Sequence, residues 1–146
     1  MFKNILVPYD GSDLSKRGLE KAITLAKAVG AQITGFHVAP DLDASMRAYL
    51  PEAAYIPDEY NEKAGDAAKE QLKEIEHQCA AAGVPYTAHY VLSEFVADAI
   101  VEAAEKHKCD LIAIASHGRT GLARVMLGSQ TQKVLAQAAI PVLVFK

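Results

Sequence analysis

The stretch that decides the fold is Leu111-Ile112-Ala113-Ile114-Ala115-Ser116-His117-Gly118. Its first five residues form an unbroken apolar run, which predicts a strand buried on both faces, as in a parallel sheet. A glycine-bearing loop follows the run, and a helix is expected from about Ser129 to Ala138. A strand, a glycine loop and a helix in this order are the repeating unit of an α/β protein.

The same alternation extends over the rest of the chain. Four further strands are predicted at Lys3–Val7, Ile33–Val38, Pro85–Val91 and Val142–Phe145. The intervening helices show apolar residues at helical spacing; Ser12 and Ser93 are placed to cap two of them, and Gly30 and Gly83 to end two. The sequence therefore predicts an α/β fold with one doubly wound, five-stranded parallel sheet and helices on both faces, a Rossmann-like arrangement.

Length and composition predict a single domain over residues 1–146. Residues 41–60 are expected to be irregular, either a lid or contact loop or a solvated connection. The net charge of −3 gives no sign of affinity for nucleic acid or for anionic membranes. No signal peptide or membrane span is visible, and Cys79 and Cys109 match no metal or redox spacing, so the expected location is cytoplasmic.

The loop after residue 115 and the following helix carry the candidate chemistry. Glycine lets the backbone adopt positive φ and approach a ligand closely. The free amides at a helix start attract anions, and the hydroxyls of Ser129 and Thr131 would add donors. The alternative is structural: the glycines only turn the chain, and Ser129 only caps a helix.

The stretch Ala115–Thr131 resembles the phosphate-binding signature of the universal stress protein family, Gly-x2-Gly-x9-Gly-Ser/Thr. Here Ala115 stands at the first glycine position, while Gly118, Gly128 and Ser129 match. The resemblance covers the whole chain, including Lys3-Asn4-Ile5-Leu6-Val7-Pro8-Tyr9-Asp10-Gly11-Ser12, Phe36-His37-Val38, Cys109-Asp110-Leu111-Ile112 and Ile140-Pro141-Val142-Leu143-Val144.

The resemblance implies ATP, or ADP or AMP, as the ligand, with Mg²⁺ held mainly by the phosphates. Pro8 and Tyr9 would lie beside the base, Asp10 would contact ribose or a phosphate-bound metal, and the backbone of Val38 would contact adenine. Asp10 has the alternative role of a turn residue, and Val38 that of plain packing. The implied nucleotide-binding residues are Pro8, Tyr9, Asp10, Val38, Ile114, Ala115, His117, Gly118, Arg119, Gly128, Ser129, Gln130 and Thr131.

No catalytic residue is identified, and the protein is expected to be at most a weak ATPase. The chain lacks Gly-x4-Gly-Lys-Ser/Thr and lacks Gly-x-Gly-x-x-Gly after its first strand, which argues against P-loop hydrolases and dinucleotide enzymes. Ser15 has no recognisable base or acid. His37 is expected to be a satisfied strand-end residue, and Arg119 and Arg124 either neutralise phosphate or are solvated.

Two functions come before a third, an ATPase or phosphotransferase, which would rest only on the presence of ATP. One is a nucleotide-binding stress-response protein that signals through its conformation or its dimer contacts. The other is a dimeric interaction module of the same fold that binds no nucleotide, which Ala115 favours. In both, a homodimer is expected through Val142–Phe145, an apolar edge strand that a second copy would pair.

Overall fold

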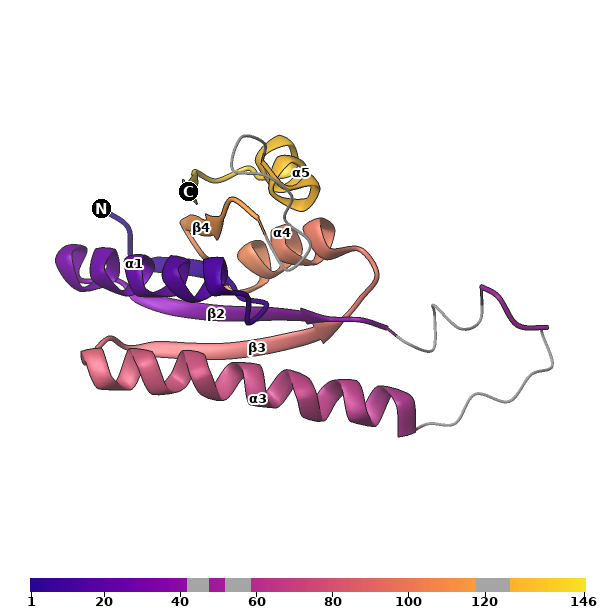
Figure 1. Cartoon of the computed structure of the whole chain (residues 1–146). Helices are drawn as coiled ribbons and strands as arrows, with labels where there is room; N and C mark the ends of the chain where they lie inside the picture. The colour runs from indigo at the N-terminus through magenta and orange to yellow at the C-terminus, as the bar shows by residue number, and fades with distance from the viewer. Residues whose placement is uncertain (42–47, 52–58, 118–126) are drawn as a thin grey trace.

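The computed structural model describes residues 1–41, 48–51, 59–117 and 127–146. Strands and helices alternate along the chain (Figure 1). Their order is β1 (Asn4–Pro8), α1 (Asp13–Val29), β2 (Gln32–Ala39), α3 (Glu59–Ala82), β3 (Tyr86–Leu92), α4 (Val96–Lys106), β4 (Leu111–Ala115), α5 (Ser129–Gln137) and β5 (Val142–Phe145). The predicted irregular stretch at 41–60 lies largely outside the described residues.

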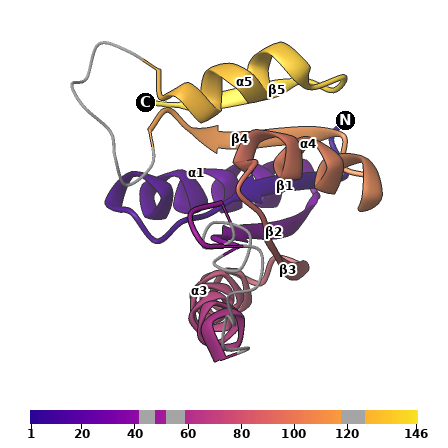
Figure 2. The same cartoon turned by 90° about the vertical axis from the view of Figure 1, so that its right-hand side faces the viewer.

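The five strands form one parallel sheet in the order β3-β2-β1-β4-β5, which confirms the predicted fold class. In Figure 2 the strand labels run in this order from the bottom of the view to the top. Successive crossovers lead from β1 outward to β2 and β3, and the chain then returns to the other side of β1 as β4 and β5. The strand order therefore reverses between β1 and β4, where doubly wound proteins bind ligands.

Two apolar cores lie on the two faces of the sheet. Alternate residues of β1 separate them: Ile5 and Val7 belong to the core under α1 and α3, and Leu6 to the core under α4 and α5. This alternation follows from the two-residue period of a strand. Each face of the central strand is covered, which explains why the strand is apolar throughout.

Helix ends follow the predicted signals in α1 and α3 but not in α4. Ser12 caps α1 by accepting from Ser15 N at 3.1 Å, and Gly30 ends the helix with φ of 72°. The prediction that Ser93 caps the third helix is wrong. That helix begins at Val96 after Phe95, and Ser93 Oγ accepts from Phe95 N at 3.0 Å, outside the helix.

At the amino end of the strands, polar contacts join segments that are distant in sequence. Asp110 accepts from the backbone N–H groups of Lys3 and Asn4 at 2.8 and 3.1 Å. The Asn4 side chain donates to His107 O at 2.9 Å and accepts from the buried Thr34 hydroxyl at 2.7 Å. These contacts attach β1 to β2 and to the chain entering β4.

Among the described residues, no helix is both long and apolar enough to cross a membrane.

Candidate functional site

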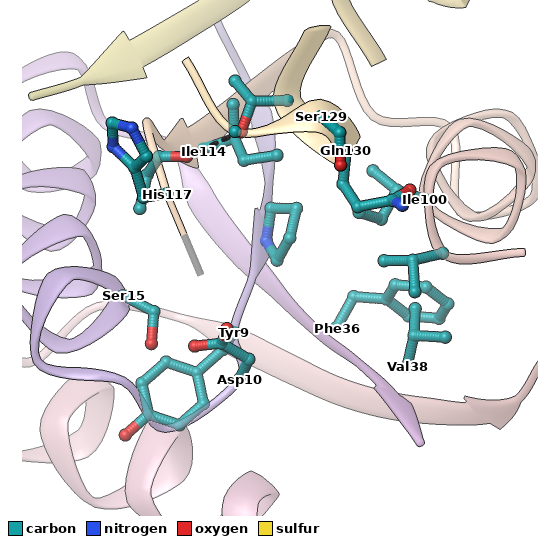
Figure 3. Close-up of a pocket in the computed structure, with 15 residues that line it drawn as sticks. Tyr9, Asp10, Ser15, Phe36, Val38, Ile100, Ile114, His117, Ser129 and Gln130 are labelled. Atoms are coloured by element: carbon teal, nitrogen blue, oxygen red, sulfur yellow. Dashed lines mark hydrogen bonds between the residues drawn. The ribbon is translucent and has the colours of Figure 1, made fainter. Parts of the chain in front are cut away.

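A cavity of about 290 Å³ opens where β1, β2 and β4 end, beside the starts of α1, α4 and α5 (Figure 3). It lies at the reversal of strand order described above. Its size is at the lower end of the range of small-molecule pockets. The lining residues are Pro8, Tyr9, Asp10, Ser15, Phe36, Val38, Val96, Ile100, Ile114, Ala115, His117, Gly128, Ser129, Gln130 and Thr131.

The structure therefore brings eleven of the thirteen residues named from the sequence to one pocket. The other two, Gly118 and Arg119, lie outside the described residues, as does Arg124.

The end of β1 supplies a carboxylate held by a turn. Asp10 Oδ1 accepts from Ser12 N at 2.9 Å, so Asp10 has the turn role that was its alternative. Asp10 also lines the pocket. The bond from Ser12 N fixes the orientation of the carboxylate, and the turn role and a role in ligand binding are therefore compatible. Nearby, His37 Nδ1 lies 2.7 Å from Tyr9 O, which confirms His37 as a satisfied strand-end histidine.

The backbone of Val38 lies beyond the last hydrogen-bonded pair between β1 and β2. In a parallel ladder, alternate residues direct both N–H and C=O to the same neighbouring strand. Phe36 O accepts from Tyr9 N on the β1 side, while Ala39 O accepts from Ser93 N on the β3 side. Val38 therefore faces the β1 side, but the β1–β2 pairing ends at Pro8 and Phe36. Its N–H and C=O are directed past the end of β1, at the pocket that Val38 lines.

The end of β4 is an ordinary strand end despite the alanine at the first signature position. Among the described non-glycine residues only Lys108 has positive φ, so Ala115 does not need a glycine conformation. A Cβ added to Gly18 of α1 would lie 3.6 Å from Ala115 Cβ. The Ala115 methyl thus packs toward α1, and the Ala115 carbonyl accepts from the Thr131 hydroxyl at 3.1 Å.

That Thr131 contact corrects one expectation. The hydroxyl proton was expected to serve a phosphate, but it is donated to the strand backbone, and Thr131 is buried. Its role is to hold the first turn of α5 against β4.

Gly128 is required for a different reason from the one expected. Its φ is −59°, so it does not use the positive φ that glycine permits. A Cβ at Gly128 would lie 3.2 Å from Ser116 O and 3.5 Å from His117 Cα. Gly128 N also donates to Ser116 O at 2.8 Å, and Gly128, rather than Ser129, is the N-cap of α5. The glycine permits a close approach of two backbone segments.

The first turn of α5 presents backbone donors at the pocket. The first bond of the helix runs from Gln132 N to Gly128 O, so the amides of Ser129, Gln130 and Thr131 have no acceptor within the helix. The first turn carries no acidic residue. Partial positive charge at this end favours an anion.

His117 contributes a polar atom without a partner. Its Nδ1 lies 3.0 Å from Ser116 Oγ. Its Nε2 is buried, and no group in the described part of the chain forms a hydrogen bond with it. Leaving such an atom unpaired has a cost in free energy that a bound group could offset.

Gln130 joins two helices at the rim of the pocket. Its Oε1 accepts from Ala97 N at 3.2 Å, across 33 residues of sequence. Ala97 lies in the first turn of α4, where Phe95 offers no side-chain cap. The glutamine therefore supplies from α5 the acceptor that the local sequence of α4 does not.

Four pocket residues were missed by sequence reasoning: Ser15, Phe36, Val96 and Ile100. Helical and strand periodicity marks Phe36 and Ile100 as apolar, but it does not separate a residue facing the core from one facing a cavity. Ser15 was considered only as a nucleophile. Its hydroxyl donates to Ser12 O at 3.0 Å, which is a structural contact at the start of α1.

The pocket has two chemically different ends. Phe36, Val38 and Ile100 form an apolar end, and Asp10, His117 and the start of α5 form a polar one (Figure 3). This arrangement suits a ligand with a flat apolar part and an anionic tail. Within the described residues, no group of three or more His, Cys, Asp or Glu side chains could hold a metal ion.

Comparison with known proteins gives consistent matches over the whole chain. The model of the universal stress protein family matches residues 1–146. Universal stress protein MJ0531 of Methanocaldococcus jannaschii is 36% identical over 148 residues, covering 100% of this chain and 83% of the relative. A universal stress protein of Thermus aquaticus is 35% identical over 147 residues, with 100% of both chains covered.

Solved structures are similar in fold. The structure of MJ0577, a protein of M. jannaschii, has a TM-score of 0.83 at 26% identity, covering 100% of this chain and 96% of that one. A universal stress protein solved in complex with cAMP has a TM-score of 0.73 at 23% identity, covering 99% and 97%. A universal stress protein from Archaeoglobus fulgidus solved in complex with dAMP has a TM-score of 0.64 at 22% identity, covering 99% and 98%.

Proposed function

The chain belongs to the universal stress protein family, and from this premise we propose that it is a stress-response protein that binds ATP, with hydrolysis slow or absent. The observation that carries the proposal is the pocket itself. At one reversal of strand order it combines an apolar end, an outward-facing backbone donor and acceptor at Val38, and the uncapped amides of α5.

In this proposal each part of the nucleotide meets a matching part of the pocket. The base lies between the apolar side chains, where it accepts a hydrogen bond from Val38 N–H and donates one to Val38 C=O. The phosphates bind at the start of α5. Asp10, held by Ser12 N, contacts ribose or the Mg²⁺ that the phosphates carry. The ligand also offers a partner to His117 Nε2, which forms no hydrogen bond in the described part of the chain. Related proteins solved with cAMP and dAMP support an adenine nucleotide as the ligand class.

The test is thermal unfolding with and without ATP and Mg²⁺. A ligand at 100 times its dissociation constant stabilises the folded state by about 2.7 kcal/mol. For a chain of this size, the Tm should rise by roughly 5 to 10 °C. An unchanged Tm at millimolar ATP would contradict the proposal.

We also propose that signalling proceeds through a homodimer paired along β5. This strand is at the edge of the sheet, it pairs with β4 on one side among the described residues, and Leu143 is 37% exposed. A two-fold axis would let each copy pair the other's open edge. The two buried free thiols, Cys79 and Cys109, support a reducing compartment, and we propose the cytoplasm.

The second candidate function is an interaction module that binds no nucleotide, and Ala115 is the feature that favours it. Protein purified without added ligand distinguishes the two, because bound nucleotide is visible by absorbance and mass. The Ala115→Gly variant, which completes the signature, should bind ATP as tightly as the parent or more tightly. It should also be less stable by about 0.5–1 kcal/mol, because glycine has more freedom to lose in a strand.

A further inference from the structure

The carboxamide of Gln130 has a fixed orientation. A backbone N–H only donates, so the side-chain atom 3.2 Å from Ala97 N is the oxygen of the amide and not its nitrogen. The Nε2 group, with two N–H donors, is thereby directed away from Ala97. Nε2 forms no hydrogen bond with the residues that the structure describes.

The position of this nitrogen is at the apolar end of the pocket. Figure 3 shows the Gln130 side chain extending toward Ile100, on the side where Phe36 and Val38 lie, and away from His117. Among the other labelled polar side chains in Figure 3, Asp10, Ser15 and His117 lie away from Phe36 and Val38, and Ser129 lies beside Gln130 at the start of α5. Gln130 is therefore the side chain placed to form a hydrogen bond with whatever occupies the apolar end.

We propose that Gln130 is a specificity-determining residue, whose Nε2 donates to a ring-nitrogen acceptor of a purine base bound at the apolar end. This inference rests on the proposed ATP binding and identifies a residue that distinguishes a purine from a base without this ring nitrogen. The N–H and C=O of Val38 bind the edge of adenine that carries the N1 acceptor and the 6-amino donor. The N3 or N7 lone pair of the same purine then remains for Gln130.

The same bond to Ala97 also has a structural consequence that the experiment must separate. Gln130 caps α4 from another helix, because Phe95 supplies no side-chain cap. A residue with a structural role alone would, when replaced, weaken every nucleotide by the same factor. Replacing a residue that forms a hydrogen bond with the base would instead remove the difference in affinity between a nucleotide that has the acceptor and one that lacks it.

The experiment measures dissociation constants by calorimetry for ATP, 3-deaza-ATP and 7-deaza-ATP, on the parent and on two variants. Gln130→Met keeps the length of the side chain and removes both the donor and the acceptor. Gln130→Glu keeps an oxygen for Ala97 N and removes the donor, so it serves as the matched control for the cap. The Tm of each protein reports the loss of the cap separately.

The parent should bind ATP about three- to tenfold more tightly than at least one deaza analogue, the loss expected for one neutral hydrogen bond. In both variants that ratio should fall to about one. A ratio of one in the parent, or a ratio that persists in either variant, would overturn the inference while leaving ATP binding intact. Failure of the parent to bind ATP at all would overturn the proposed function and this inference together.

Discussion

Replacing Gly128 by alanine tests the close approach of α5 to the end of β4. The added Cβ would lie 3.2 Å from Ser116 O, a few tenths of an ångström closer than an ordinary contact. Ser116 is poorly able to yield, because its N–H is bonded to Phe145 O at 2.8 Å. The start of α5 should move outward, weakening the 2.8 Å bond from Gly128 N to Ser116 O.

Overpacking of this kind costs about 1–3 kcal/mol, which corresponds to a fall in Tm of roughly 3–10 °C. Because the same movement displaces the amides proposed to bind phosphate, ATP affinity should fall at least about tenfold. Gly18→Ala is the matched control: its Cβ would meet Ala115 Cβ at an ordinary 3.6 Å. That variant should be neutral or more stable by up to about 1 kcal/mol, since alanine favours helices.

Calorimetry for ATP and thermal unfolding measure both effects on the two variants. A Gly128→Ala variant that matched the parent in Tm and in ATP affinity would refute the requirement for glycine at this close approach. The requirement is equally refuted if Gly18→Ala is the more damaging substitution.

Three further predictions follow from particular contacts. Asp10→Asn keeps an acceptor for Ser12 N but removes the charge, so titration calorimetry should show weaker Mg²⁺-ATP binding with little change in Tm; unchanged affinity would leave Asp10 as a turn residue only. Leu143→Lys should give a folded monomer by light scattering that still binds ATP, because the pocket is built within one chain; a parent that is already monomeric at tens of micromolar would contradict the proposed dimer. Burial raises the pKa of the Cys79 thiol to about 11 from an ordinary 9.0. The folded state therefore disfavours the thiolate. The contribution of this thiol to the free energy of unfolding is fully present below pH 9 and is lost as the pH rises toward 11. Urea unfolding at pH 8 and pH 10.5 should show a larger fall for the parent than for Cys79→Ala, and equal falls would exclude this cause.

Sequence patterns predicted the fold well because apolar runs and glycines act locally. The bounds of β4 and β5 agree with the prediction, and Gly30 ends α1 as expected, since each signal lies within the element that it defines. The start of α4 was missed for the opposite reason. Ser93 resembles an N-cap, yet the acceptor for the first turn of α4 comes from Gln130, far along the chain.

The candidate site was predictable to the extent that it follows a motif. Val38 and Gly128 were named from the resemblance, but their physical roles needed the structure: one lies past the end of a ladder, and the other lies against a backbone carbonyl. Phe36 and Ile100 were not named as site residues. Apolar periodicity does not indicate that part of their surface borders a cavity.

The attachment of β1 to Asp110 has a consequence for how the chain matures on the ribosome. The central strand is synthesised before the other four strands, yet the acceptor for Lys3 N is 107 residues later. At about 5–20 residues per second, β1 waits roughly 5 to 20 seconds before that carboxylate is even made. Pairing of β1 with β4 therefore comes late in folding, and until then the nascent amino-terminal half exposes the unpaired backbone edge of an apolar strand. A chaperone that binds extended apolar segments would find its target there, before the pocket exists.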